Sequence, residues 1–158
     1  MTASSGQTYL AIPGPSVIPE EVLRSMHRSA PNIYEGELIE ITKSLIPDLN
    51  YVARSSGNVA IYIANGHGIW EAALSNITTA NDHILVLATG RFAHGWAEMA
   101  RKLGVKVDVV DFGKNKALDI EVLAKKIKSE PKNKYKAILM THVDTSTSVK
   151  NDIFNVRK

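Results

Sequence analysis

The sequence predicts an α/β fold, in which a mostly parallel sheet lies between two layers of helices. From Val59 onward, short apolar runs alternate with longer stretches whose apolar residues recur at helical spacing. Runs such as Ile84–Leu87 are apolar at every position, which is typical of strands that helices cover on both faces. Together these features predict a three-layer α/β domain, although they do not reveal the order of its strands.

The first part of the chain is predicted to be an extended arm followed by two helices. Closely spaced prolines prevent a helix from continuing through residues 1–18. Pro19 then starts a helix, because proline is tolerated in a first turn and the two glutamates after it suit the positive end of the helix dipole. A second helix is predicted from about Gly36 to Tyr51, although Pro47 allows a kink or an end near Leu45.

The remaining elements alternate between short apolar strands and amphipathic helices. Strands are predicted at Val59–Ile63, Ile84–Leu87, Val105–Val110 and Ala137–Met140, and helices at His67–Ile77, Arg91–Leu103 and Leu118–Lys128. Residues 19–158 are therefore expected to belong to one domain, incomplete at its carboxyl end, and residues 1–18 to form an extended arm before it.

Composition restricts the possible functions of the chain. With 44% hydrophobic and 22% charged residues it has the balance of a soluble globular protein, and no apolar run reaches the roughly 20 residues of a membrane span. The net charge is +3, and the one dense basic stretch, Lys125–Lys136, alternates with Glu130 and apolar residues, so no nucleic-acid surface is expected. No cysteine is present, which excludes disulfides and thiolate metal sites. Met1–Thr8 has no features of a secretion signal, so a cytoplasmic protein is expected.

One loop carries most of the chemical information. Ala64–Glu71 joins a predicted strand to a predicted helix through Gly66 and Gly68. At the start of a helix several N–H groups have no intrahelical partner, and together with the helix dipole they favour a bound anion or phosphate. The glycine spacing matches neither the dinucleotide nor the ATP signature, so the phosphate of another cofactor stays open. The alternative is an ordinary turn in which His67 is an exposed polar residue.

Four segments resemble one family. Asn65–Leu74, with the sequence Asn-Gly-His-Gly-Ile-Trp-Glu-Ala-Ala-Leu, is similar to the phosphate-binding turn of class V (fold-type I) aminotransferases, and closest to their alanine–glyoxylate and serine–glyoxylate branch. Pro13–Ser16 resembles the Pro-Gly-Pro arm of that family, and His27–Ser29 its short His-Arg-Ser element. Thr141–Ser148 resembles its Thr-His-x-Glu-x-Ser-Thr-Gly segment. Four matches in the same order are more specific than any one of them.

The resemblance implies a cofactor, pyridoxal 5′-phosphate, and residues that hold it. It assigns Asn65, Gly66 and His67 to the cofactor phosphate, Phe92 to stacking on the pyridine ring, and Thr145 to the neighbourhood of the ring oxygen. A flat aromatic side chain is adequate for stacking on a flat ring. Phe92 has an alternative interpretation, however, because it shares a helical stripe with Trp96 and Met99 and would then belong to the core.

The chain also departs from the pattern of the family. Val143 and Ser148 stand where glycines are expected, which leaves the backbone of that loop open to a different course, and Asn65 replaces a smaller residue. The family's aspartate at the pyridine nitrogen, its cofactor-bearing lysine and its substrate-binding arginine all come later than the last matching segment. This chain ends at Lys158, before all three. It is therefore expected to carry no catalytic residue and to be inactive alone.

The resemblance implies an aminotransferase that moves an amino group from alanine or serine to glyoxylate, with small amino acids and 2-oxo acids as substrates. This chain would form the amino-terminal part of the large cofactor-binding domain, and the full-length form would be a homodimer. One alternative is a truncated or degenerate, non-catalytic remnant that retains phosphate binding or dimerisation. A metal hydrolase that uses His67, His94, His142 and Asp144 is a further alternative, but their spacing matches no standard metal motif.

Overall fold

The computed structural model describes Leu10, Ile12, Gly14 and residues 16–158. The chain divides into two compact units, Met1–Ile61 and Tyr62–Lys158. Most of the arm predicted over residues 1–18 lies outside the described residues, including Pro13 and Pro15 of the Pro-Gly-Pro motif, so the boundary of the arm stays a prediction.

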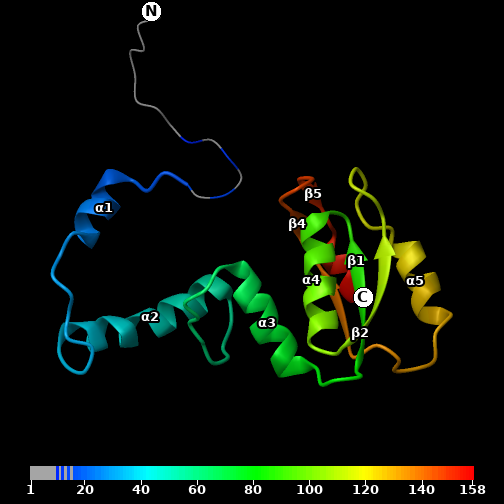
Figure 1. The fold of residues 1–158 in the computed structure, drawn as a ribbon, viewed down its shortest axis with the longest axis horizontal. Helices are drawn as coiled ribbons and strands as arrows, with labels where there is room; N and C mark the ends of the chain where they lie inside the picture. The colour runs from blue at the N-terminus through cyan, green and yellow to red at the C-terminus, as the bar shows by residue number, and fades with distance from the viewer. Residues whose placement is uncertain (1–9, 11, 13, 15) are drawn as a thin grey trace, which may run out of the picture. The chain divides into compact units, whose positions relative to one another are not determined.

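The first unit contains the two predicted helices, α1 (Glu20–Met26) and α2 (Glu37–Ala53) (Figure 1). Helix α2 continues through Pro47 and does not end near Leu45. Proline removes one backbone hydrogen bond, and the turns on either side maintain the helix. Neither helix contains a buried residue. No helix in the described part of the chain combines the length and the apolar character needed to cross a membrane.

The strand predicted at Val59–Ile63 is absent, and this prediction was wrong. The segment has no regular secondary structure, and the side chain of Ile63 is fully exposed. A strand is stable only when a neighbouring strand accepts and donates its backbone hydrogen bonds. Neither sheet of the described residues includes this segment, so its apolar composition alone does not make it a strand.

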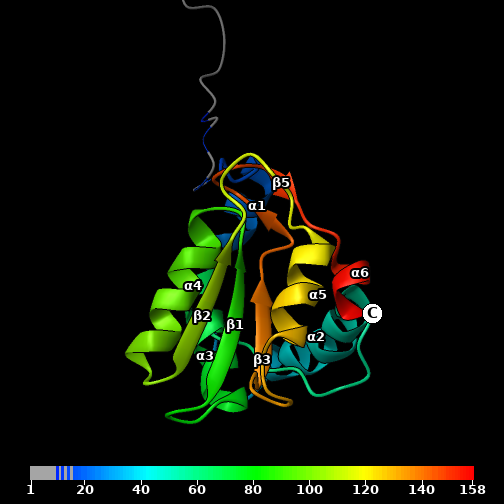
Figure 2. The same ribbon diagram turned by 90° about the vertical axis from the view of Figure 1, so that its right-hand side faces the viewer.

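The second unit is built on a parallel sheet of three strands. These are β1 (His83–Ala88), β2 (Lys106–Asp111) and β3 (Ala137–Met140), which confirm the three other predicted strands to within about two residues. Their order is β2-β1-β3, so the first strand along the chain lies in the middle (Figure 2). Both pairings of β1 are parallel, as a sheet with helical crossovers requires.

Helices cover both faces of this sheet, because β1 is apolar throughout. Ile84, Val86 and Ala88 pack against α4 (Arg91–Lys102), and the alternate residues Leu85 and Leu87 face α5 (Ile120–Lys128). Figure 1 shows β1 between these two helices. Helix α4 lies close to the sheet because its buried residues are all alanines: Ala93, Ala97 and Ala100. Helix α3 (Gly66–Ile77) packs against α4 and adds Leu74 to this core. The three-layer prediction is confirmed.

Three short elements near the end of the chain were not predicted. Strands β4 (Val143–Asp144) and β5 (Val149–Lys150) form an antiparallel hairpin, and α6 (Ile153–Arg157) follows it. Two-residue strands and a five-residue helix are too short to show a hydrophobic period. The hairpin lies at the carboxyl end of the sheet (Figure 2).

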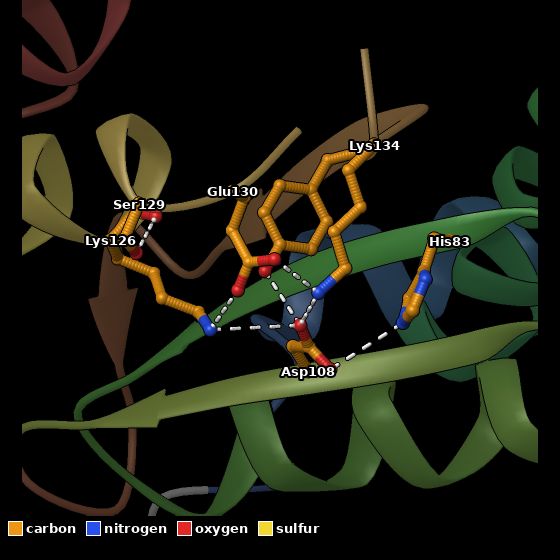
Figure 3. A network of polar contacts seen from close by, with 7 residues as sticks. His83, Asp108, Lys126, Ser129, Glu130 and Lys134 are labelled. Carbon is orange, nitrogen blue, oxygen red and sulfur yellow. Dashed lines mark hydrogen bonds and ion pairs between the residues drawn. The ribbon is translucent and has the colours of Figure 1, made fainter. Parts of the chain in front are cut away.

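A polar network lies near the opposite, amino-terminal end of the strands (Figure 3). At its centre the Asp108 carboxylate accepts hydrogen bonds from the Lys134 ammonium at 2.8 Å and the Tyr135 hydroxyl at 2.6 Å. Lys134 also donates to Glu130 at 2.7 Å, and His83 Nε2 lies 3.4 Å from Asp108. The bonds from Lys134 and Tyr135 hold the pKa of Asp108 well below its ordinary value. The network ties β2 to the segment before β3.

Candidate functional site

Helix α3 begins with an open turn. Asn65 precedes the helix in an extended conformation, and its side-chain oxygen accepts a hydrogen bond from His67 N at 3.1 Å. The N–H of Gly66 has no hydrogen-bond partner among the described residues, and a Cβ at Gly66 would meet no atom within 4 Å. No acidic residue lies in the first turn. This turn therefore presents a free donor to open space at the positive end of the helix dipole.

The start of α4 differs, because the hairpin closes it. Gly90 has no side chain that could cap the helix, and the caps come from residues more than 50 positions later. Phe92 N donates to Asp144 Oδ2 at 2.9 Å, and Ala93 N donates to the same oxygen at 3.3 Å. Arg91 N donates to the Ser146 hydroxyl at 3.0 Å. The N–H groups at this helix start have no partner within the helix, and they donate instead to Asp144 and Ser146 of the hairpin.

Asp144 is a fully buried carboxylate. Its second oxygen, Oδ1, accepts hydrogen bonds from the N–H of Ser146 at 3.0 Å and from the Ser146 hydroxyl at 2.5 Å. Burial by itself raises the pKa of Asp144, but the hydrogen bonds from Ser146, Ala93 and Phe92 outweigh it, and the pKa is lowered below its ordinary value. Hydrogen-bond donors therefore favour the ionised form of the Asp144 carboxylate.

Four aromatic rings join the starts of α3 and α4. The ring of His67 lies 4.5 Å from that of Trp70 and 6.0 Å from that of Phe92, measured between centroids. Trp70 stacks on Trp96, with centroids 5.6 Å apart. Beside these rings lies an open cleft of about 580 Å³, which is in the usual size range of small-molecule sites. It is lined by His67, Trp70, Arg91, Phe92, His94, Gly95, Glu98, Met99 and Lys102.

Phe92 lies in this cleft and not in the core. The buried face of α4 consists of Ala93, Ala97 and Ala100, with Trp96 and Met99 packed at its margin. Phe92 is half-buried, stands outside both buried core clusters and lines the cleft opposite His67. The geometry therefore favours a side chain available to a ligand over the alternative of a core residue.

Thr145 is exposed in the turn of the hairpin, directly after Asp144. The same turn contains Ser148 at φ +57°, which is the left-handed conformation that favours glycine. The backbone at this position thus adopts a conformation typical of glycine although serine occupies it. Val143, the other residue that stands where glycine is expected, forms part of β4.

Of the residues that the sequence assigned to a cofactor, the structure brings His67 and Phe92 to one cleft, whereas Asn65, Gly66 and Thr145 do not line it. Asn65 and Gly66 lie directly before His67 at the start of α3. Thr145 follows the residue that accepts the hydrogen bond from Phe92 N. Because the segments after β1 and β3 leave the same edge of a parallel sheet, their residues meet although they are about 50 positions apart.

Two buried polar residues of this region were missed by the sequence reasoning. The sequence marks Asp144 only as a possible metal ligand and as one position of the Thr141–Ser148 segment, and nothing in it marks Asn151. Asn151 donates to Thr89 Oγ1 and to the carbonyl of Thr141, each at 2.8 Å, and accepts from Leu118 N at 2.9 Å. It thereby joins the carboxyl ends of β1 and β3. The sequence offered one sign of such a residue. Gly90 precedes α4 and has no side chain to cap the helix, so the cap must come from another part of the chain.

The arrangement of the histidines does not support the metal alternative. Both oxygens of Asp144 are taken by hydrogen bonds, and His94 lies 3.1 Å from Asp111, away from the hairpin. Within residues 16–158 no group of three or more His, Asp or Glu side chains is placed to hold a metal ion.

Comparison with known proteins identifies the relatives of the chain. No protein-family model matches the sequence. The chain is 33% identical over 153 residues to the serine–glyoxylate aminotransferase of Arabidopsis thaliana, and 32% identical over 158 residues to that of Methylorubrum extorquens. Over nearly its whole length the chain is thus similar to one part of serine–glyoxylate aminotransferases. These matches cover 96% and 99% of the chain, and they do not favour the alternative of a degenerate remnant.

The aminotransferase relatives are much longer than this chain, which spans 38% and 39% of those two proteins. Solved structures show the same fold. The alanine–glyoxylate aminotransferase from Nostoc sp. superimposes with a TM-score of 0.82 at 20% identity, and the ureidoglycine–glyoxylate aminotransferase from Bacillus subtilis with 0.81 at 23%. Each covers 97% of this chain, and the chain covers 40% and 39% of them. The chain thus shares the α/β fold of one part of these structures.

Proposed function

We propose that the chain forms the part of a pyridoxal-phosphate-dependent aminotransferase that holds the cofactor. The proposal rests on one observation: the ring of His67, directly after the free N–H of Gly66 at the start of α3, lines one cleft with the half-buried ring of Phe92. The names of the relatives support a whole enzyme that moves an amino group from serine or alanine to glyoxylate.

The residues present fit the cofactor. The phosphate would be held by the N–H of Gly66, and by the N–H of His67 once the Asn65 side chain gives way. Phe92 would support the flat face of the pyridine ring, and the hydroxyl of Thr145 would lie near the ring oxygen. When bound, the cofactor supplies a ring that withdraws electrons from the amino acid. The residues of this chain bind and orient that ring.

Tryptophan fluorescence tests this proposal directly. The chain has two tryptophans, and both Trp70 and Trp96 belong to the aromatic cluster beside the cleft. Pyridoxamine 5′-phosphate is a suitable probe, because it lacks the aldehyde that would react with surface lysines. We expect it to quench this fluorescence saturably, and pyridoxamine without the phosphate to bind at least tenfold more weakly. Equal quenching by the two compounds would contradict the proposal.

A pair of variants at Gly66 isolates the backbone donor. Proline fits here, because Gly66 is the first helical residue and Asn65 before it is already extended. Gly66→Pro therefore deletes one N–H and retains the helix, whereas Gly66→Ala retains the N–H and adds a methyl group to open space. We expect the proline variant to lose about tenfold in affinity for pyridoxamine 5′-phosphate, and several-fold more than the alanine variant. Similar losses in both variants would place the phosphate elsewhere.

We further propose that the full-length protein is a cytoplasmic homodimer that acts on small amino acids and 2-oxo acids. The exposed apolar side chains of α1, among them Leu23 and Met26, are available for a subunit contact. Sedimentation of the full-length protein tests the dimer, and a fully active monomer would contradict it.

A further inference from the structure

Two helix starts border the candidate cleft, and they differ in their free donors. The rings of His67 on α3 and Phe92 on α4 lie 6.0 Å apart, so both helix starts lie close to the same space. At α3 the N–H of Gly66 is free among the described residues. At α4 the N–H groups of Arg91, Phe92 and Ala93 are all bonded to the hairpin. The difference comes from a single buried carboxylate, Asp144, and the serine that it holds.

Gly90 is required by this arrangement. A Cβ at position 90 would overlap the carboxylate of Asp144. The backbone of Gly90 is extended, with φ at 175°, so the need for glycine comes from space and not from conformation. The carboxylate therefore sits directly on the backbone at the start of α4, where the positive end of the helix dipole favours a negative charge.

We propose that Asp144 is a positioning residue for the cofactor: through the backbone of α4 it fixes the ring of Phe92 at the cleft, and by occupying the start of α4 it leaves the start of α3 as the place for the phosphate. This inference rests on the proposed cofactor site. Asp144 itself is fully buried, so it would act on the cofactor only through the residues that it holds. Its lowered pKa agrees with a carboxylate held as an anion by these donors.

The substitution that tests this role is Asp144→Asn. It retains the size of the side chain, removes the charge and turns an NH2 group toward at least one N–H donor, because an amide has a single acceptor oxygen. Either the N–H groups of Phe92 and Ala93 or the N–H of Ser146 then lose their acceptor, and in both cases the charge that neutralises the dipole of α4 is removed. We expect affinity for pyridoxamine 5′-phosphate to fall about tenfold or more, because Phe92 is no longer held in place.

A second readout separates positioning from loss of structure. In a titration with inorganic phosphate, the amide NMR signal of Gly66 reports the α3 turn alone. We expect Asp144→Asn to bind phosphate at Gly66 as well as the wild type does, and phosphate to shift the amide signals of Phe92 and Ala93 in the variant only. The variant would thus bind pyridoxamine 5′-phosphate more weakly and inorganic phosphate at Gly66 equally well. An unfolded chain could not show this difference.

Asp119→Asn is the matched control. Asp119 caps α5 in a similar way, with Oδ1 accepting from Glu121 N at 2.8 Å and Val122 N at 3.4 Å, and it does not line the cleft. We expect it to lower stability by the loss of a helix cap, while its affinity for pyridoxamine 5′-phosphate equals that of the wild type. Ser146→Ala gives a milder test if Asp144→Asn does not fold. It removes the hydrogen bond from Arg91 N to the serine hydroxyl and the one from that hydroxyl to Asp144, and it retains the carboxylate, so a loss of about threefold is expected.

The outcomes separate the two proposals. Failure of the wild type to bind pyridoxamine 5′-phosphate would overturn the proposed cofactor site itself. Normal binding by the wild type, with unchanged affinity in folded Asp144→Asn or in Ser146→Ala, would overturn only the role of Asp144. An equal loss of affinity for pyridoxamine 5′-phosphate and for inorganic phosphate at Gly66 would also overturn the role of Asp144. A general structural role of this residue would then explain both losses.

Discussion

At the scale of single residues, Ser148 shows how the hairpin keeps its shape. Its backbone lies at φ +57°, where a side chain with a Cβ is less stable than glycine by about 1–2 kcal/mol. The hairpin nevertheless places Ser146 and Thr147 so that they bond to Arg91 N and to the carbonyl of Thr89. These contacts with the ends of β1 and α4 determine the turn, and the strain at Ser148 is the consequence.

Replacing Ser148 by glycine should relieve this strain. Glycine also loses more conformational entropy on folding, so the net gain in the free energy of unfolding is expected to be about 0.5–1 kcal/mol. Urea unfolding measures it. Ser129→Gly is the matched control, because Ser129 has φ at −80°, and there glycine should destabilise the chain. Destabilisation by both substitutions would show that the turn is not strained.

At the scale of elements, the network around Asp108 fixes β2 to the segment that leads into β3. Its members come from β1, β2, the end of α5 and the residues just before β3, and each is about one third exposed or less: His83, Asp108, Lys126, Glu130 and Lys134. Partly buried charge pairs of this kind are costly to break from one side, because the remaining charge stays desolvated. The network lies at the amino-terminal end of the strands, whereas ligands of α/β sheets bind at the carboxyl end. Its role is structural.

Asp108→Asn should lower the free energy of unfolding at pH 7 by about 1–3 kcal/mol, because Lys134 and Tyr135 lose a charged acceptor. The pKa of Asp108 is lowered in the folded chain, so its contribution is fully present above the unfolded value of about 3.9 and is lost as the pH falls through the lower folded pKa. The difference between wild type and variant should therefore stay constant from about pH 5 to 8 and shrink below about pH 4.

Urea unfolding at several pH values checks this prediction. Glu98→Gln is the control, because it removes a charge from the exposed pair with Lys102 and should change the free energy of unfolding by less than about 0.5 kcal/mol. A difference for Asp108→Asn that does not shrink in acid would show that lost packing, and not the charge, is responsible.

At the scale of the whole molecule, the two units differ in how much they bury. The strands and helices of the second unit enclose two clusters of fully or nearly fully buried apolar residues. The helices of the first unit contain no buried residue, and α2 leaves Ile41, Leu45 and Leu49 exposed. Burial of apolar area is the main source of stability, so stability should be concentrated in the second unit.

Amide hydrogen exchange should show this difference directly. We expect the amides of β1 to be the most protected and those of α1 and α2 to exchange at least a hundredfold faster, since little buried area opposes their opening. Mass spectrometry of peptides from the exchanged chain measures both in one experiment. Equal protection of α2 and β1 would show that the first unit has a stability of its own that its burial does not explain.

The sequence by itself determined the architecture of the second unit. A strand such as β1 that is apolar at every position has to be covered on both faces, and α4 and α5 cover it. The same local pattern failed at Val59–Ile63, because an apolar run becomes a strand only if another strand pairs with it, and that depends on the rest of the chain. The start of α3, with Asn65 and two glycines, was also readable locally, since helix caps and free donors depend on neighbouring residues.

Tertiary structure alone decided how the candidate site is held together. Phe92 and Asp144 are separated by 52 positions, and no local pattern relates them. They meet because β1 and β3 are parallel neighbours, so that the segments after them leave the same edge of the sheet. That juxtaposition places a carboxylate on the start of α4 and leaves the start of α3 open, because hydrogen bonds over long separations are set by strand order and not by composition.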